Sequence, residues 1–396
     1  MKSLELFSGA GGLAKGLELE GFKHMAFVEF NRDACKTLRN NFDSTKVFEG
    51  DIRDYSFSRV GDVDIVAGGP PCQPFSLGGK HKASDDFRDM FPYALKAIRD
   101  LKPKAFVFEN VKGLLRPTFS DYFKYILLRL KYPDCTGKNY SSWCAHLGNL
   151  LNLSECVNAP PDYRVYFKLI NAAAYGIPQT RERVIIVGIR ADIDGAWQFP
   201  EGRYSFERLL WEQYVSGTYW ERHGFREPLE YTHSPHFMRR IEGIKRKYGL
   251  TYPPGKPWAT MRDVLGRLPE PAGNHSIADH RFRGGARSYS GHTGSMFDFP
   301  SKTIKAGVHG VPGGENMIRY SNDRIRYLTI HEAKLIQGFP EDFTIHGAWG
   351  EAMRQIGNAV PCNLGEEIGF SIIKFLNELY SNSNKSEASI SIANAL

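Results

Sequence analysis

The chain has 396 residues, of which 42% are hydrophobic and 24% charged, and its formal net charge is +7. This length allows one large domain with a smaller one, and the composition is that of a soluble globular protein. No apolar run approaches the roughly 18 residues of a membrane-spanning helix, and Glu5 interrupts the short apolar start, so no signal peptide is expected. We therefore expect a cytoplasmic protein that contacts no membrane.

The first 190 residues alternate between predicted strands and helices, with a glycine-rich turn over residues 8–12. The predicted strands cover residues 4–7, 24–30, 64–67, 105–108 and 183–189, and the predicted helices cover 13–19, 90–101 and 122–130. This alternation predicts an α/β fold with a doubly wound, mostly parallel sheet that helices cover on both faces.

The pattern changes after residue 192. Residues 192–320 are rich in Gly, Pro, Tyr, Trp, Arg and His and contain few long apolar runs, which indicates a smaller, irregular domain. Helical patterning returns over residues 330–337 and 364–380. The Ser- and Asn-rich tail from residue 381 is predicted to be flexible.

A nucleoside cofactor suits the beginning of the chain. A predicted strand is followed by the glycine-rich turn and then by a helix. The glycines let the backbone approach a ligand closely, and the N-terminus of the helix offers free N–H groups. Glu29 ends the second strand, where a carboxylate can accept hydrogen bonds from ribose hydroxyls, and Asp51 ends a third. The alternative is a tight turn that binds nothing. The spacing G-x-G-x-x-G is absent, which disfavours NAD.

Cys72 lies in a stiff turn after a buried strand. Pro70 and Pro71 precede it and Pro74 follows it, so the chain presents this thiol at a sheet edge. A single cysteine is most often an inert core residue, but the flanking prolines make packing a poor explanation. Cys135, Cys144, His146 and Cys156 also cluster, but irregular spacing and the lack of any C-x-x-C pair lead us to predict no metal site.

Several motifs together resemble those of the DNA (cytosine-5) methyltransferases of bacterial and phage restriction-modification systems. They are Pro71-Cys72-Gln73, Glu109-Asn110-Val111, Gln179-x-Arg181-x-Arg183 and Gly357-Asn358-Ala359-Val360-Pro361, and the match extends to residues 7–12 and 326–340. The blocks follow the family's order over nearly the whole chain except the middle domain and the tail. The resemblance implies a Rossmann-like fold that uses S-adenosyl-L-methionine and releases S-adenosyl-L-homocysteine.

The resemblance also assigns catalytic roles. It implies that Cys72 adds to C6 of cytosine, which makes C5 nucleophilic. It implies that Glu109 contacts N3 and the exocyclic amine, and that Arg181 and Arg183 stabilise negative charge near the cytosine O2. Without the family, Glu109 is as easily a capping carboxylate, and the two arginines a solvated pair on a strand edge.

Further residues are assigned to the cofactor and to DNA. The cofactor residues implied are Phe7, Gly9, Gly11, Gly12, Glu29, Asp51, Ile52, Pro71 and Asn358, the last expected beside the glycine-rich turn. The chemistry requires the target base to be flipped out of the duplex, and a loop over residues 76–88 is expected to close over it. The DNA-binding candidates are Gln73, Ser76, Lys80, Lys82, Arg281, Arg283, Arg287, Lys302 and Lys305.

These assignments divide the chain by function. The predicted segments are a catalytic domain (1–190), a target-recognition domain (191–320), a connecting hinge (321–345), a C-terminal part that returns to the catalytic domain (346–380) and the tail (381–396), with a surface insertion over about 131–162. Between residues 191 and 326, 20 Lys and Arg outnumber 15 Asp and Glu, which suits phosphate contacts. We expect two lobes that face each other across a DNA cleft.

The expected partner is double-stranded DNA, with a cognate restriction endonuclease that acts separately. The protein is expected to be a monomer and, without a long N-terminal regulatory region, a stand-alone bacterial or phage enzyme. Two alternatives stay open. The first is a tRNA cytosine-5 methyltransferase, which the large middle domain disfavours; the second is a catalytically silent DNA-binding protein, which the complete set of Cys72, Glu109, Arg181 and Arg183 disfavours.

Overall fold

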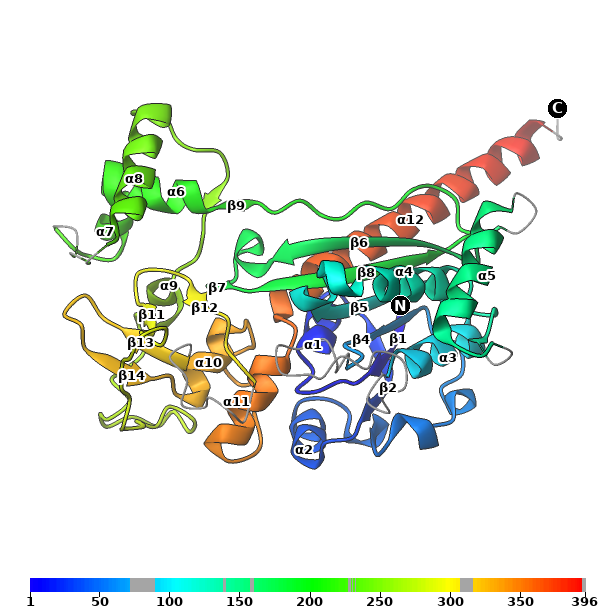
Figure 1. Ribbon diagram of the computed structural model, residues 1–396, viewed down its shortest axis with the longest axis horizontal. Helices are drawn as coiled ribbons and strands as arrows, with labels where there is room; N and C mark the ends of the chain where they lie inside the picture. The colour runs from blue at the N-terminus through cyan, green and yellow to red at the C-terminus, as the bar shows by residue number, and fades with distance from the viewer. Residues whose placement is uncertain are drawn as a thin grey trace. The chain divides into compact units, whose positions relative to one another are not determined.

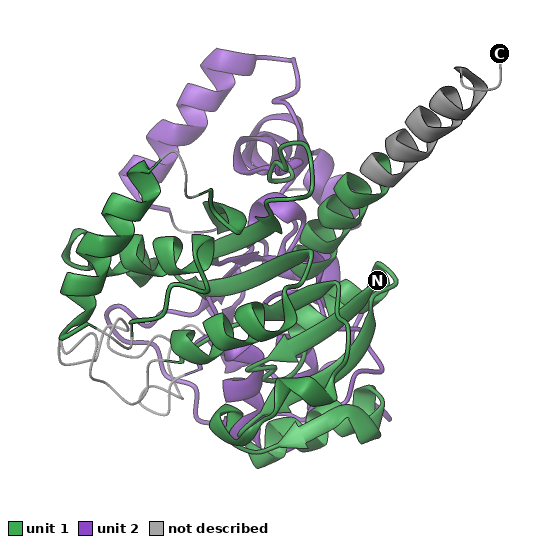
Figure 2. Ribbon diagram, turned by 90° about the vertical axis from the view of Figure 1, so that its right-hand side faces the viewer, with its two compact units in different colours: residues 1–170, 182–200, 364–396 green, residues 171–181, 201–363 purple. Residues whose placement is uncertain are grey.

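The computed structural model describes residues 1–71, 90–137, 140–156, 160–226, 229, 231, 233–306 and 316–393, with side chains as far as 378. It divides into two compact units (Figure 2). Unit 1, drawn in green, comprises Met1–Ile170, Glu182–Pro200 and Leu364–Leu396, and unit 2, drawn in purple, comprises Asn171–Arg181 and Glu201–Asn363. Residues 171–181 and 346–363 therefore fold with unit 2, although the predicted functional segments grouped them with the catalytic part of the chain.

A seven-stranded sheet forms the centre of unit 1 (Figure 1). Its order is β3-β2-β1-β4-β5-β8-β6. The strands are β1 (Lys2–Leu6), β2 (Lys23–Glu29), β3 (Val47–Glu49), β4 (Ile65–Gly68), β5 (Ala105–Val111), β6 (Tyr163–Asn171) and β8 (Glu182–Arg190). The pairs from β3 to β5 are parallel, and β8 runs antiparallel to β5. The predicted mostly parallel sheet is confirmed.

Helices cover both faces of this sheet because alternate strand residues point to opposite sides. On one face, Leu6 and Phe108 belong to a core cluster that includes Phe91 of α3 (Phe91–Leu101) and Tyr122 of α4 (Ser120–Lys131). On the other face, Phe27 packs with residues of α1 (Gly12–Leu19) and α2 (Arg32–Asn41). The predicted α/β, doubly wound architecture is therefore confirmed.

The long helix α12 (Cys362–Ala393) brings the C-terminal segment back to unit 1. At Gly365 a Cβ atom would lie 3.0 Å from the carbonyl oxygen of Leu13, so the small residue permits close contact with α1. The backbone is helical as far as Ala393, where the sequence predicted a flexible tail. Along the described part of the chain, no helix is both long and apolar enough to cross a membrane.

Unit 2 is built from short elements, as the irregular composition of its sequence predicted. Its helices are α6 (Phe206–Trp211), α7 (Thr218–Arg222), α8 (Pro235–Tyr248), α9 (Met261–Leu265), α10 (Ile330–Ile336) and α11 (Trp349–Asn358). Its strands are β7 (Gln179–Thr180), β9 (Tyr204–Ser205), β10 (Lys256–Pro257), β11 (Ser295–Met296), β12 (Ser301–Lys302), β13 (Met317–Arg319) and β14 (Ile325–Tyr327). Several polar side chains are buried within this unit.

Asp298 is the clearest example of such a side chain. Asp298 is fully buried. Its carboxylate accepts hydrogen bonds from the Tyr219 hydroxyl at 2.8 Å and from the Tyr231 hydroxyl, and it forms an ion pair with Arg262. Removing a charge from water costs several kcal/mol unless it is paired and hydrogen-bonded. The three donors meet that requirement and tie together segments that lie far apart in the sequence.

Candidate active site

The carboxyl ends of the parallel strands meet where the strand order reverses. In the sheet, β2 and β3 lie on one side of β1, and β4 and β5 lie on its other side. Leu6 at the end of β1 pairs with Val28 and with Gly68, and Gly68 pairs with Phe108. Ligands of open α/β sheets bind at this switch point, so the site is expected at this edge.

The glycine-rich turn and Glu29 are held together at one half of the edge. The carboxylate of Glu29 accepts hydrogen bonds from the backbone N–H groups of Gly9 and Asn31, each at 2.7 Å. Gly9 has a φ of +54° and open space around the position of a Cβ atom, and Phe7 has a φ of +51°. A non-glycine residue in this region is strained, and such strain clusters at ligand sites. The predicted turn thus has room for a ligand beside a carboxylate.

Asp51 and Phe30 extend this half of the site. Asp51 follows β3, and hydrogen bonds from Arg53, which include the side-chain Nε at 2.9 Å, lower the pKa of the Asp51 carboxyl. Ile52 is buried next to it. Phe30 directly follows Glu29 and is 75% exposed. The sequence reasoning missed Phe30, although an aromatic residue directly after an acidic strand end is a recognisable signal for a base-stacking surface.

The predicted cofactor residues of the helix and the turns also have defined positions. Gly11 is the N-terminal cap of α1, with a φ of +82°, and Gly12 is the first residue of that helix. The backbone N–H of Met90 donates to the carbonyl oxygen of Pro71 at 3.4 Å. Asn358 ends α11 in unit 2. Its expected proximity to the glycine-rich turn stays a prediction.

The turn that leads to Cys72 is fixed by its neighbours in the sheet. A Cβ atom at Gly68 would collide with the carbonyl oxygen of Leu6, so β1 and β4 require glycine there. The buried side chain of Asn110 donates from Nδ2 to the carbonyl oxygen of Pro70 at 3.1 Å. Cys72, Gln73, Ser76, Lys80 and Lys82 all lie in the stretch 72–89, outside the described residues.

Glu109 and Arg183 form a shielded ion pair at the same edge. Antiparallel pairing of β5 with β8 places Arg183 opposite Val111, two residues beyond Glu109. Arg183 Nε lies 2.6 Å from Glu109 Oε1, and the side chains are only 13% and 10% exposed. At Gly69, in the turn toward Cys72, a Cβ atom would lie 3.5 Å from Glu109 Oε2. The carboxylate that the sequence singled out therefore faces this turn with a cation beside it.

Arg181 has a different environment from Arg183. It is 1% exposed, and its Nη2 donates to the carbonyl oxygens of Gly357 at 2.8 Å and Ala359 at 3.0 Å. Its Nη1 donates to the carbonyl oxygen of Ile304 at 3.4 Å. All of these residues belong to unit 2. Arg181 thus donates to the backbone on both sides of Asn358, and its expected role near cytosine O2 stays a prediction.

Two glutamines complete this buried cluster. Gln179 donates from Nε2 to Oε1 of Gln337 at 2.7 Å, and the backbone N–H of Ile304 donates to Gln179 Oε1 at 3.2 Å. Gln337 in turn donates to the carbonyl oxygen of Ala359 at 2.5 Å. We call Gln179, Arg181 and Gln337 the buried hub. It joins three segments of unit 2 to the C-terminal end of α11, where Asn358 lies.

An acid-free segment, exposed over most of residues 281–291, carries the predicted DNA-binding arginines. Residues 280–297 contain no Asp or Glu, and Arg281, Arg283 and Arg287 are exposed within it. The guanidinium of Arg283 lies 4.2 Å from the ring centroid of Trp349. Lys302 Nζ lies 3.4 Å from Thr293 Oγ1, which places this lysine beside the segment. Lys305 is also exposed.

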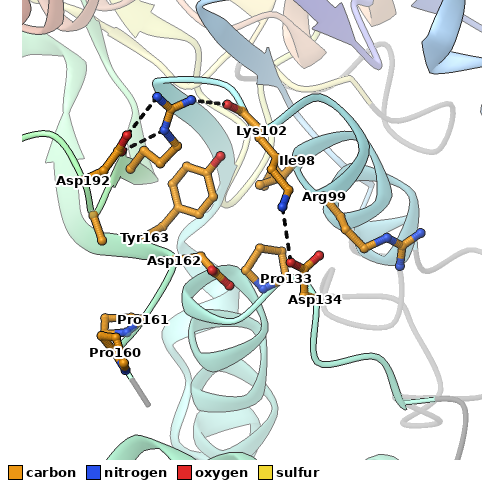
Figure 3. Close-up of a pocket in the computed structure, with 12 residues that line it drawn as sticks. Ile98, Arg99, Lys102, Pro133, Asp134, Pro160, Pro161, Asp162, Tyr163 and Asp192 are labelled. Atoms are coloured by element: carbon orange, nitrogen blue, oxygen red, sulfur yellow. Dashed lines mark hydrogen bonds and ion pairs between the residues drawn. The ribbon is translucent and has the colours of Figure 1, made fainter. Parts of the chain in front are cut away.

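A pocket lies at the opposite end of the sheet (Figure 3). It has a volume of about 310 Å³ and is lined by residues that include Lys102, Tyr163 and Arg190. Lys102 precedes the start of β5 and Arg190 ends the antiparallel β8, so the pocket adjoins the amino end of β5. Glu109 lies near the carboxyl end of β5, and the pocket is therefore separate from the candidate active site.

No metal site emerges from the described part of the chain, in which no three His, Cys, Asp or Glu side chains are grouped so as to hold an ion. In the cysteine-rich segment around α5 (Trp143–Glu155), His146 is instead fully buried among side chains of α4 and α5.

Comparison with known proteins shows which family the sequence matches. The model of the family described as C-5 cytosine-specific DNA methylase matches residues 1–134 and 159–374. Type II methyltransferase M.NgoMIV of Neisseria gonorrhoeae is 30% identical over 380 residues, which cover 94% of this chain and 97% of the relative. Type II methyltransferase M.PspPI of Psychrobacter sp. is 31% identical over 380 residues, which cover 94% and 79%.

Solved structures with the same fold cover nearly the whole chain. A variant of Spodoptera frugiperda DNMT2 gives a TM-score of 0.54 at 16% identity and covers 95% of this chain and 99% of its own. The Entamoeba histolytica methyltransferase EhMeth gives 0.53 at 17% identity and covers 96% and 98%. At these identities the comparison shows the fold alone.

Proposed function

The chain belongs to the C-5 cytosine-specific DNA methylase family, and on that premise we propose how its residues perform the reaction. It is a sequence-specific DNA cytosine-C5 methyltransferase. The observation that carries the mechanism is the shielded pair of Glu109 and Arg183 beside the turn that leads to Cys72. A carboxylate and a guanidinium fixed at one sheet edge can stabilise the negative charge that develops on the cytosine ring during the reaction.

Cys72 is the nucleophile of this mechanism. Its sulfur forms a bond to C6 of the flipped cytosine, and the electron pair displaced from the C5–C6 bond makes C5 nucleophilic. Glu109 holds a proton at N3 as that charge develops on the ring. Arg183 orients the Glu109 carboxylate and supplies positive charge at the same edge. After methylation a base, for which the family suggests water, takes the C5 proton; the electron pair of that C–H bond restores the C5–C6 double bond and expels the Cys72 sulfur.

Arg181 is a positioning residue in this proposal. Its guanidinium donates hydrogen bonds to the carbonyl oxygens of Gly357 and Ala359, on both sides of Asn358, and is buried away from solvent. Three hydrogen bonds from one planar cation fix a loop more rigidly than separate neutral donors do. The role of Arg181 is to hold the end of α11 that carries Asn358, rather than to touch the base.

The residues at the carboxyl edge fit a nucleoside methyl donor. Glu29 accepts from the backbone N–H of Gly9, where a Cβ atom would meet open space, and Phe30, the next residue, is exposed. We assign ribose recognition to Glu29, adenine stacking to Phe30 and adenine hydrogen bonding to Asp51. S-adenosyl-L-methionine, bound there, supplies an electrophilic methyl group and leaves as S-adenosyl-L-homocysteine. A carboxylate already held by two backbone N–H groups needs no rearrangement to accept a ribose hydroxyl.

DNA recognition is assigned to unit 2. The acid-free segment 280–297 offers three arginines to phosphate and to base edges. Lys302 lies beside the segment, and exposed Lys305 follows three residues later. The relatives are named Type II methyltransferases, and we propose that this enzyme likewise protects DNA in the bacterial cytoplasm, as a monomer, against a separate restriction endonuclease.

Methyl transfer from radiolabelled S-adenosyl-L-methionine to unmethylated plasmid DNA and to tRNA, followed by bisulfite sequencing, tests this proposal. We expect label at cytosine C5 within one short DNA motif. Replacement of Cys72 by Ser should abolish methylation and preserve DNA binding. Label confined to tRNA contradicts the DNA substrate, absence of label supports a silent DNA-binding protein, and methylation by Cys72→Ser contradicts the mechanism.

A further inference from the structure

Helix α8 of unit 2, labelled in Figure 1, carries positive charge that the proposed mechanism does not use. Residues 231–260 contain six Lys and Arg against a single acid, Glu242. This short segment thus has an excess of five positive charges, whereas the net charge of the whole chain is +7. The segment lies outside residues 280–297, to which DNA recognition is assigned.

Packing fixes which side of α8 is buried. Ile241 and Ile244 are the buried residues of this helix. Ile244 forms a core cluster with Phe299, and Phe237 and Met296 pack against the same cluster. Because Met296 and Phe299 lie at the end of the acid-free segment and just after it, this cluster anchors α8 to the part of unit 2 that carries the recognition arginines.

The cations lie away from this core. At 3.6 residues per turn, residues seven apart are nearly aligned, so Arg239 lies in line with Arg246, and Arg240 with Lys247. Members of each pair are about 10 Å apart along the helix axis. All four side chains are exposed. We call Arg239, Arg240, Arg246 and Lys247 the basic face of α8.

Gly243 lies between the two ends of the basic face. A Cβ atom at this position would meet no atom of the described residues within 4 Å, so packing within the protein does not require a glycine here. Glycine in the interior of a helix is less favourable than alanine. The missing side chain leaves space in which an extended polyanion can approach the helix backbone between the cations.

Stability of the helix does not account for all of these charges. The helix dipole favours cations in the last turn, where Arg246 and Lys247 lie. Arg239 and Arg240 lie in the first half of α8, and the first turn contains no acidic residue that would offset the dipole there. The arginines of the first half therefore call for an explanation outside the helix.

Ion pairs within the protein leave part of the basic face unneutralised. Lys247 Nζ lies 3.3 Å from Glu207 Oε2, and Glu242 pairs with Lys245, which is outside the basic face. No carboxylate pairs with Arg239 or Arg246 within the described part of the chain. These two aligned guanidinium groups can therefore bind an external anion without first breaking an ion pair.

We propose that the basic face of α8 binds phosphates of duplex DNA outside the recognised motif. This inference rests on the proposed function and adds to it a surface that increases affinity without reading sequence. Cations contact phosphate oxygens whatever the bases are, and binding releases the counterions of the DNA. An anionic membrane fits less well, because a helix that lies on a membrane inserts an apolar face, and that side of α8 is already buried.

The salt dependence of DNA binding by the full chain tests this proposal. The Arg239→Gln/Arg246→Gln double variant is compared with wild type on duplexes of about four helical turns, with and without the motif that bisulfite sequencing identifies. We expect the slope of log Kd against log salt to fall by about 2, one for each lost phosphate contact, and Kd to rise about tenfold on both duplexes.

Lys124→Gln/Lys374→Gln is the matched control, because it removes the same charge from exposed positions on α4 and α12 of unit 1 and should change neither quantity. An unchanged slope and Kd in the arginine variant overturn the proposal. Weaker binding confined to the duplex with the motif also overturns it, because α8 would then read sequence. The duplex without the motif requires no methyl transfer, so this arm is independent of the proposed reaction.

A glycine variant separates docking of the helix from diffuse attraction. Gly243→Gln keeps the net charge but fills the space between the cations, so it should weaken binding several-fold and remove hydroxyl-radical protection of the DNA backbone outside the motif. Gly148→Gln on α5 is the control, since a Cβ atom there also meets nothing within 4 Å. Wild-type binding by Gly243→Gln contradicts a docked helix. Loss of binding to phosphatidylglycerol vesicles in the arginine variant, with DNA binding retained, assigns the face to a membrane and overturns the proposal.

Discussion

Arg181 and Arg183 are separated by one residue, yet the structure uses them in opposite ways. Arg183 forms an ion pair with Glu109 at the carboxyl edge of the large sheet. Arg181 belongs to the other compact unit, where it donates to backbone carbonyl oxygens. The chain passes from unit 2 to unit 1 between Arg181 and Glu182. In the proposed mechanism, one short motif thus supplies a charge to the reaction and holds the backbone around Asn358.

The comparison separates two kinds of buried cation. A cation paired with a carboxylate favours the charged form of that carboxylate. Loss of the cation therefore changes the reaction in which the carboxylate takes part. A cation that satisfies neutral carbonyl oxygens fixes the backbone, and its loss leaves several buried acceptors without donors. The first change should appear mainly in catalysis and the second mainly in stability.

The largest effect is expected at Glu109. Glu109→Gln keeps the shape of the side chain but removes the charge and the proton-holding carboxylate, so kcat should fall by about 10²–10⁴-fold. The unfolding temperature should change little. Glu182→Gln is the matched control, because that carboxylate is 43% exposed and pairs only with Lys112 among the contacts described for it. If both variants lose activity equally, the loss is not specific to the active edge.

The next largest effect is expected at Arg181, and in stability. Arg181→Met fills similar volume but leaves the carbonyl oxygens of Ile304, Gly357 and Ala359 without this donor, which should cost about 3 kcal/mol of unfolding free energy. Denaturant unfolding measures this cost, and methyl transfer per folded molecule should stay within about tenfold of wild type below the transition. A stable Arg181→Met protein that is inactive would give Arg181 the direct catalytic role first expected from the sequence.

The stability of the fold is expected to depend on pH through His146, because this buried imidazole is neutral in the folded protein. Its pKa is lowered to about 4, whereas an unfolded histidine titrates near ~6.5. Between these values the unfolded chain binds more protons, so stability falls as the pH is lowered from about 6.5 to 4. His146→Gln should lose this part of the acid sensitivity, on the order of 3 kcal/mol. Parallel stability curves for both proteins over this range contradict the assignment.

The smallest effect is expected at Phe30, on the exposed side of the active edge. Phe30→Ala removes a stacking surface and should raise the Kd for S-adenosyl-L-methionine about tenfold, with little change in kcat at saturation. Phe370→Ala is the matched control, because Phe370 is 52% exposed on α12. Isothermal titration calorimetry measures both affinities, and an unchanged Kd for Phe30→Ala removes this residue from the cofactor site.

The sheet and most of its edge were predictable from the sequence because short apolar runs carry a local signal. The strand predicted over 183–189 and the helix predicted over 90–101 match β8 and α3 closely. β6 was not predicted, since Tyr163–Asn171 includes Arg164 and Lys168 and has several half-exposed positions. A mixed strand of this kind is recognised by its neighbours in the sheet rather than by its own pattern.

The roles within the site were harder to predict because they depend on distant partners. Nothing local in Gln179–Arg183 distinguishes the arginine that meets Glu109 from the one that meets Gly357. The assignment of Glu109 needed only its place at the end of a strand and the family resemblance. Nothing in the sequence placed Tyr125 beside His146, since the two meet where α4 packs on α5.

The most direct test of the two-arginine account is the rate at which folded protein forms a covalent adduct with duplex DNA that contains 5-fluorocytosine at the target position. Once the methyl group of S-adenosyl-L-methionine has been transferred to C5, fluorine there cannot leave as a proton, so Cys72 stays bound and the adduct is counted on a denaturing gel. We predict that Arg183→Met slows adduct formation at least about 10²-fold, whereas Arg181→Met, compared per folded molecule, stays close to wild type. Equal losses in the two variants would contradict the separation of roles on which the account rests.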